Sequence, residues 1–285
     1  MRARAICLVT FLAGCGPTPP SDQVETLTPE PAGAPTAVAD GRLTCLGNNP
    51  PPQVTSQQVV LPGWTRFFTD PTATNDGASQ TPVHAVPARI EAFSSNGASL
   101  GSTFASATDG RAALTVPITG SGFTGHLEAT CDAMCAGGAA GLIDYHFWTN
   151  RPYTQPQTAG WAWMMSQADL TAVATKAGVT VDGSKAIAAI AVHDCDGFGV
   201  GNAVVTVGGS ASGGIYFDGF DATAGTFTAA SGRVAFANLP PGSTEVKAFG
   251  RTDAGGPLTL LASITVDLKP GVITGIDLEP RNGTK

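Results

Sequence analysis

The sequence predicts a mainly β protein, built from two tandem antiparallel β-sandwiches that are joined by a segment with one short α-helix. Three observations predict this fold class. The 285 residues include 36 glycines and 21 prolines, which are typical of many tight turns. Charged residues make up only 13% of the chain, too few for the polar faces of long surface helices. Short apolar runs with a period of two residues recur between the turns, as in half-buried strands.

The charge of the chain argues against nucleic acid as a partner. The net charge is −7 at pH 7, and lysine and arginine are clustered nowhere in the sequence. A nucleic-acid-binding protein is expected to carry a basic patch. A mildly acidic surface instead favours solubility.

The first 14 residues have the pattern of a signal peptide. Two arginines precede an apolar run that is too short to span a bilayer. The run ends with Leu12-Ala13-Gly14-Cys15, which resembles the lipobox of bacterial lipoproteins. The resemblance implies cleavage before Cys15 and a lipid anchor on it, so the membrane is an expected partner. Gly16 in place of aspartate favours the outer membrane, at its periplasmic face or the cell surface. An ordinary secretory signal is the alternative.

Residues 15–40 are expected to form a disordered tether. They are rich in proline and threonine and contain few large apolar side chains. Such a composition cannot bury enough apolar surface to fold. At about 3.1 Å per residue for a polyproline-like chain, the tether would hold a domain several tens of ångströms from the membrane.

Two parts of the chain, 41–133 and 187–280, repeat one pattern. In each part a Gly-Arg pair opens an alternating apolar run, at Gly110-Arg111 and at Gly232-Arg233. Several such runs per repeat predict a small antiparallel sandwich. In the second repeat, further strands are expected at 204–207, 244–249, 258–268 and 273–278.

The second repeat also carries a more specific motif. The run Val200-Gly201-Asn202-Ala203-Val204-Val205 is followed by Gly232-Arg233-Val234-Ala235-Phe236 and by Asn238-Leu239-Pro240-Pro241-Gly242. This order resembles the carboxypeptidase regulatory-like domain, a transthyretin-like β-sandwich. The resemblance implies that the Leu-Pro-Pro-Gly turn is a structural corner. Ser231 and Thr244 depart from the family pattern, and the first repeat matches it more weakly, as a diverged sandwich.

The segment 134–186 interrupts the β pattern and is rich in aromatic residues. Ser166 and Asp169 resemble a capping box, and the apolar spacing after them predicts a helix over 167–177 that ends at Gly178. Large aromatic side chains favour either packing between the two sandwiches or a platform for a polysaccharide or peptide. The residues proposed for such a platform are Trp148, Tyr153, Trp161 and Trp163.

Four cysteines remain after the signal peptide and the lipidation residue. In an exported chain these cysteines are expected to be oxidised, because compartments outside the cytosol favour disulfides. We expect two disulfides among Cys45, Cys131, Cys135 and Cys195. The favoured pairing joins Cys45 to Cys131 or Cys135 and Cys195 to the other of these two. The alternative is a zinc site that also uses His193.

The sequence contains no recognisable catalytic set. Residues 97–101 match G-x-S-x-G, but turn residues precede the serine where a nucleophile elbow needs a strand. The four histidines have no metal-binding spacing, and we predict neither a metal site nor a cofactor. The predicted function is therefore that of a membrane-anchored envelope lipoprotein with a structural or binding role and no catalysis. The alternatives are an accessory module that binds carbohydrate or peptidoglycan, and an unrecognised hydrolase. Besides the membrane, the partners considered are a polysaccharide or an envelope protein.

Overall fold

The computed structural model describes residues 25–46, 54, 56–67, 85–120, 122–131, 141–154, 161–219, 221–223 and 225–280. The predicted signal peptide, Cys15 and Cys135 lie outside the described residues. The described part of the chain is mainly β, with several sheets and one helix. That part contains no helix with the length and apolar character needed to cross a membrane.

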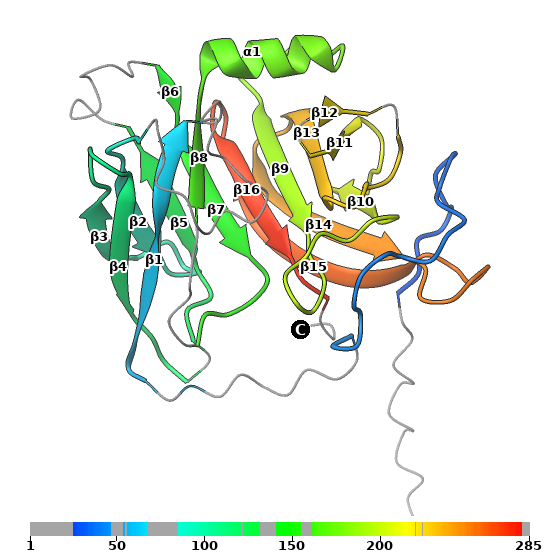
Figure 1. Cartoon of the computed structure of the whole chain (residues 1–285), viewed down its shortest axis with the longest axis horizontal. Coiled ribbons are helices and arrows are strands. Elements are labelled where there is room, and N and C mark those ends of the chain that lie inside the picture. Colours follow the sequence, from blue (N-terminus) through cyan, green and yellow to red (C-terminus); the bar gives the residue numbers. More distant parts are fainter. Residues whose placement is uncertain are drawn as a thin grey trace, which may run out of the picture.

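Two smaller sheets lie at the two ends of the molecule (Figure 1). The four-stranded sheet has the order β4 (Arg111–Pro117), β1 (Gln58–Phe67), β8 (Trp161–Ser166) and β6 (Leu142–Ile143). The three-stranded sheet has the order β10 (Val204–Val207), β14 (Gly242–Gly250) and β15 (Thr259–Leu268). Each of these sheets covers part of a larger sheet that runs between them.

We call residues 58–166, from the first strand to β8, the first half of the protein and residues 186–278, to the last strand, the second half. The larger sheet has nine strands and contains strands from both halves. Its order is β12 (Asp221–Ala222), β11 (Gly214–Asp218), β13 (Arg233–Leu239), β9 (Ala186–Val192), β16 (Ile273–Leu278), β7 (Tyr145–Thr149), β5 (His126–Thr130), β2 (Arg89–Phe93) and β3 (Ser99–Phe104). The last strand, β16, is parallel to β7 on one side and to β9 on the other. The halves are therefore not separate in the way that the sequence led us to expect, because one sheet runs through both.

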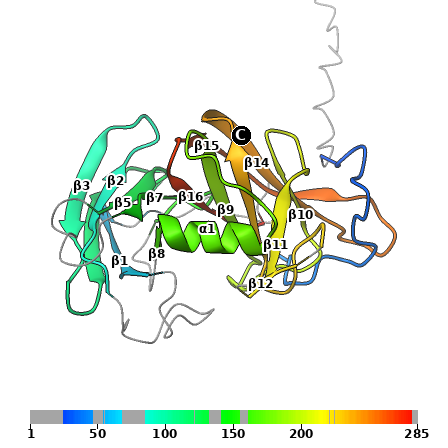
Figure 2. The same ribbon diagram turned by 90° about the horizontal axis from the view of Figure 1, so that it is seen from above.

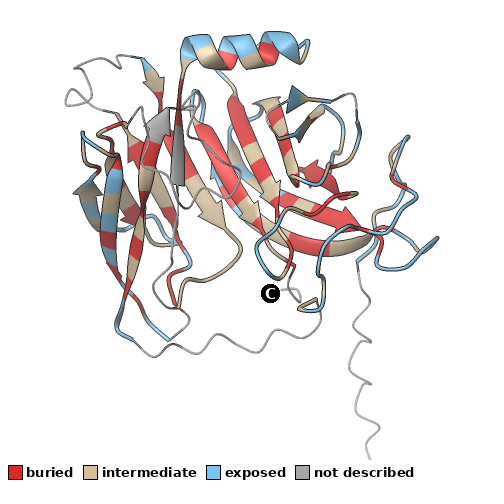
Figure 3. Ribbon diagram, viewed as in Figure 1, coloured by how far each residue is buried: buried red, intermediate tan, exposed pale blue. Residues whose placement is uncertain are grey.

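The protein has two main hydrophobic cores, on opposite faces of the nine-stranded sheet. Along β9, Ile187 and Ala189 contact the first core, beneath the four-stranded sheet, whereas Ala188 and Ile190 contact the second core, beneath the three-stranded sheet. Buried residues accordingly follow one another along the central strands β9 and β16 (Figure 3). Consecutive residues of a central strand can thus both be buried, which removes the polar alternation seen at an exposed sheet.

The same strand pairing occurs once in each half. In the first half, β1 is antiparallel to β4 and parallel to β8; in the second, β9 is antiparallel to β13 and parallel to β16. Gly110 and Gly232 precede β4 and β13 with φ angles of 67° and 69°. A Cβ at either position would lie 2.2 Å from a carbonyl oxygen, that of Thr65 or that of Val192. The repeated Gly-Arg pair therefore has one physical cause, a backbone contact that excludes a side chain.

The helix α1 (Gln167–Lys176) confirms the helix predicted from the sequence. The Ser166 hydroxyl accepts a hydrogen bond from the Asp169 amide, and the Asp169 carboxylate accepts one from the Ser166 amide, which completes the capping box. The helix extends from β8 toward β11 and β12 (Figure 2), where Lys176 forms an ion pair with Asp221. The rest of the segment 134–186 differs from the expected linker, because it supplies β6, β7 and β8.

The turn that follows β13 carries the chain from the nine-stranded sheet to β14 of the three-stranded sheet. Asn238, the last residue but one of β13, has a φ of 59°. Its side-chain amide donates to the Thr180 carbonyl at 2.8 Å and accepts from the Asp182 amide at 2.7 Å. The turn is thus a corner of the scaffold that is tied to the segment after α1.

Residues 25–46 lie against the second half, and we call them the N-terminal strap. Leu27 and Ala39 donate backbone hydrogen bonds to Leu258 and Arg251, and Asp40 forms a β-bridge with Gly201. The expected tether thus requires a correction from residue 25 onward. The strap contains too few apolar residues to fold alone, but it packs on apolar surface that the second half provides. Leu27 and Ala34, for example, pack beside Phe249.

One buried arginine holds the strap in place. Arg251 is 9% exposed and donates to the carbonyl of Pro35 at 2.8 Å through Nε. Its two terminal nitrogens donate to both carboxylate oxygens of Glu30, at 3.0 and 2.6 Å. A bidentate guanidinium–carboxylate pair is directional and strong, so it fixes the path of the strap.

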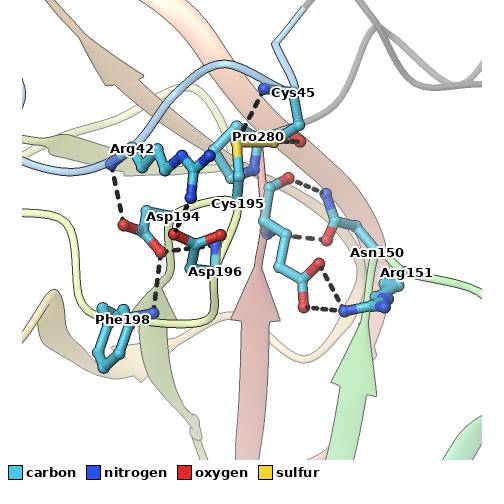
Figure 4. Close-up of a disulfide and its surroundings, with 10 residues drawn as sticks. Arg42, Cys45, Asn150, Arg151, Asp194, Cys195, Asp196, Phe198 and Pro280 are labelled. Carbon is cyan, nitrogen blue, oxygen red and sulfur yellow. Dashed lines mark hydrogen bonds and ion pairs between the residues drawn. A yellow bond between two sulfur atoms is a disulfide. The ribbon is translucent and has the colours of Figure 1, made fainter.

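The end of the strap is joined covalently to the loop after β9 by a disulfide between Cys45 and Cys195 (Figure 4). The favoured pairing of Cys45 with Cys131 or Cys135 is therefore wrong. Cys131 is disulfide-bonded as well, so the sulfurs of Cys195 and Cys131 are not zinc ligands. The sequence spacing could not show that the strap crosses the second half and ends beside residue 195.

Candidate functional site

The pairing of β5 with β7 brings four side chains with polar atoms together on one face of the nine-stranded sheet. His126 and Glu128 are two residues apart on β5, so both point to the same face. His126 lies opposite Trp148 on β7, and Glu128 lies opposite His146. Two histidines that are 20 positions apart in the sequence thus flank one carboxylate.

Three nitrogen atoms approach a single oxygen of Glu128. Its Oε1 lies 3.1 Å from His126 Nε2 and 3.4 Å from His146 Nε2. The ammonium of Lys269, directly after β15, lies 3.1 Å from the same oxygen. We call the three residues His126, Glu128 and His146 the junction cluster.

Aromatic side chains fix the ring of His126. The Trp148 ring stacks on it with 4.3 Å between ring centroids and an interplanar angle of 12°. Phe93, which lies opposite His126 on β2, stacks at 5.2 Å and 14°. Because both neighbours lie nearly parallel to the imidazole, its orientation is set by packing before any ligand arrives.

The two histidines of the junction cluster are buried and Glu128 is partly buried, and burial and hydrogen bonding together change the ionisation of the cluster. His126 is 8% exposed and His146 is 3% exposed. The hydrogen bond with His126 lowers the pKa of Glu128 to about 2, although burial opposes this shift. Burial lowers the pKa of His146 to about 4. At neutral pH the cluster therefore holds an ionised carboxylate beside a neutral imidazole.

Several buried polar atoms on this face have no hydrogen-bond partner among the described residues. They are Nδ1 of His126, Nδ1 of His146, Nε1 of Trp148 and Oγ1 of Thr274. Thr274 is fully buried on β16, directly opposite His146. Unpaired buried polar groups are uncommon in native proteins and ask for a physical reason, such as a bound ion.

The position of the cluster in the fold explains its burial. The cluster lies on the face of the nine-stranded sheet that carries the second core, and Trp148 packs against that core. Lys269 reaches it from the end of the three-stranded sheet. The polar residues of the first half are thus covered by the second half, and the cluster forms at the junction between the two.

Of the residues that the sequence suggested as an aromatic platform, Trp148 and Tyr153 pack into different cores. Trp148 packs against the second core, whereas Tyr153 packs against the first core and stacks on Phe123 at a centroid distance of 6.1 Å. Burial raises the pKa of Tyr153 far above its usual value. Trp161 and Trp163 belong to β8 in a different sheet, and their side chains lie outside the described residues.

The junction cluster is the candidate site that the sequence did not reveal. The spacing His126-x-Glu128 is visible on a strand-like run and places both side chains on one face. The third member depends on the register between β5 and β7, which no local pattern specifies. Two imidazoles and a carboxylate that converge in this way can hydrogen-bond to one another or hold a cation together.

Comparisons with known proteins assign no family. No family model matches the chain, and no curated protein matches it. Among solved structures, the Bacillus anthracis TIE protein is 11% identical with a TM-score of 0.26, over 79% of this chain and 34% of that chain. A streptococcal ancillary pilin is 10% identical with a TM-score of 0.23, over 80% and 64%. The minor pilin of Streptococcus agalactiae is 11% identical with a TM-score of 0.21, over 81% and 98%.

The chain therefore spans about a third of the first of these proteins and less than two thirds of the second. Similarity of this degree establishes neither a shared fold nor a shared function. The function must be argued from the chain itself.

Proposed function

We propose that the chain is an exported protein of the bacterial cell envelope, anchored by lipid at Cys15, with a structural or binding role rather than a catalytic one. The Cys45–Cys195 disulfide is the observation that carries the proposal. Disulfides persist in oxidising compartments outside the cytosol and are rare within it. The lipobox-like run that ends at Cys15 supplies the anchor.

The proposal also includes the internal organisation of the body. We take the two halves to be diverged copies of one sandwich, the second of the carboxypeptidase regulatory-like type. The matching pairings of β1 with β4 and β8, and of β9 with β13 and β16, support this view. The equivalent contacts of Gly110 and Gly232 support it as well.

The anchor is tested by replacing Cys15 with alanine and following the protein through membrane fractionation. The wild-type chain should sediment with membranes and incorporate a clickable fatty acid. Cys15→Ala should lose the label and appear in the soluble fraction. Cys7→Ala is the matched control, because Cys7 lies inside the predicted signal peptide and its loss should change neither result.

The outcomes separate export from anchoring. If Cys15→Ala stays on the membrane and keeps the fatty-acid label, the lipid anchor is refuted. If the wild-type chain is soluble but Cys45 and Cys195 resist alkylation without reductant, export stands and the anchor does not. A reduced Cys45–Cys195 pair in freshly lysed cells would refute export itself.

A further inference from the structure

We propose that His126, Glu128 and His146 bind a divalent first-row transition-metal ion at the junction between the two halves of the protein. The donors are two imidazole nitrogens and one carboxylate oxygen, and each candidate ligand atom lies within 4.8 Å of the others. Imidazole and carboxylate together suit Zn²⁺ and its neighbours in the first transition row. The site goes beyond a purely structural role for the envelope protein, and its test does not depend on the lipid anchor.

Two of the distances between the donor atoms match the edges of a coordination polyhedron, and all three donor atoms lie within 4.8 Å of one another. Zinc binds nitrogen and oxygen at about 2.0–2.1 Å, which places ligand atoms about 3.3 Å apart at the corners of a tetrahedron. The two separations from Glu128 Oε1 are 3.1 and 3.4 Å. An ion can therefore be placed among these atoms with only small shifts of the side chains.

The ligands already have the right charge and a fixed orientation. Metal binding requires neutral imidazole and ionised carboxylate, and these are the forms of His146 and Glu128 at neutral pH. His126 is held between Trp148 and Phe93. A site whose donors are fixed in advance loses little conformational freedom when the ion binds.

The ammonium of Lys269 lies beside Glu128 and would repel a metal ion bound there. The Lys269 side chain must therefore move away when the ion binds. Its ammonium neutralises Glu128 in the present arrangement, at 3.1 Å. The Lys269 side chain is 46% exposed and follows the end of β15, so it can swing into solvent. The metal and the ammonium thus compete for one carboxylate, and three protein ligands leave a fourth metal position open to water or another ligand.

This competition distinguishes a metal site from an ion pair that only stabilises the fold, because the two predict different Zn²⁺ affinities for variants of Glu128 and Lys269. The full chain, purified in oxidised form and freed of metal with a chelator, is titrated with Zn²⁺ alone by calorimetry. We expect one ion per chain with micromolar or tighter affinity. Glu128→Gln, which keeps the shape but removes the charge, should weaken binding at least about tenfold. Lys269→Gln should strengthen it, because the competing cation is gone.

Two further measurements keep the test independent of misfolding. Zn²⁺ should raise the unfolding temperature of the wild-type chain, because it binds the folded state, and Glu128→Gln should abolish this rise. Co²⁺ should give a visible absorption spectrum that His146→Gln removes. His193→Gln is the matched control, since His193 also lies near a carboxylate, with its Nδ1 at 4.0 Å from Asp277, and its replacement should leave Zn²⁺ binding unchanged.

Three results would overturn the proposal. The first is the absence of saturable Zn²⁺ binding to a folded wild-type chain. The second is equal Zn²⁺ affinity in the wild type and in a folded Glu128→Gln variant. The third is weaker binding after Lys269→Gln, which would mean that the ammonium supports the ion's site instead of competing for it.

Discussion

Removing the Cys45–Cys195 disulfide should destabilise the protein by an amount that follows from the chain length it closes. The two cysteines are 150 residues apart, so the bond restricts the unfolded chain over more than half of its length. The loop-entropy relation gives about 5 kcal/mol at 25 °C for a loop of this size. For a protein of this length, that corresponds to a fall in unfolding temperature of roughly 10 °C.

The perturbation is the double replacement Cys45→Ser and Cys195→Ser, which removes the bond without leaving an unpaired thiol. Two neighbouring hydrogen bonds do not involve the sulfur atoms and should survive the replacement. The Cys195 amide donates to the Arg42 carbonyl at 2.9 Å, and the Arg42 amide donates to the Asp194 carboxylate at 2.9 Å (Figure 4). The loss should therefore come from the unfolded state and not from local damage.

The assay is thermal and urea unfolding of the wild type and the double variant, followed by circular dichroism. Reductant is unsuitable as the only perturbation, since it would also open the disulfide of Cys131. An unfolding midpoint within about 2 °C of the wild type would refute the reasoning. It would mean that the strap is held only weakly in the folded protein, so that the disulfide restricts the folded chain and the unfolded chain to a similar extent.

Two other predictions concern packing and charge. Gly275→Ala on β16 should cost at least about 2 kcal/mol in thermal unfolding, since its Cβ would lie 1.8 Å from the Tyr145 hydroxyl. Gly183→Ala, with no atom within 4 Å of its Cβ, should be nearly neutral, and equal losses would contradict the packing argument. Glu30→Gln should lower the urea midpoint at pH 7, because Arg251 holds the pKa of Glu30 below its usual 4.5. That stabilisation is complete above pH 4.5 and is lost as the pH falls through the lower folded pKa, so the two proteins should converge in acid.

Local patterns in the sequence predicted the local structure well. The capping box at Ser166 and Asp169 placed α1 within a residue of its observed end, because capping involves only neighbours in the chain. The alternating runs predicted at 204–207, 258–268 and 273–278 match β10, β15 and β16. In each case the information lies within about ten residues.

The strand β7 was missed for a physical reason. It lies between β16 and β5, and the residues of Tyr145–Thr149 contact cores on both faces of the sheet. Such a strand shows no alternation, so its aromatic residues resembled a linker. The shared sheet, the junction cluster and the Cys45–Cys195 pair all depend on contacts between distant segments, which periodicity and spacing do not encode.

If Cys15 carries the proposed lipid, the docked strap limits how far the protein can stand from the membrane. Glu25 lies ten positions after Cys15, and a chain of that length spans at most about 35 Å when fully extended. Glu25 is held at the edge of β15, where its carbonyl accepts a hydrogen bond from the Leu260 amide at 2.8 Å. A lipid on Cys15 would therefore keep the three-stranded sheet close to the bilayer. The first half would then lie farther from the bilayer and would be accessible to other molecules.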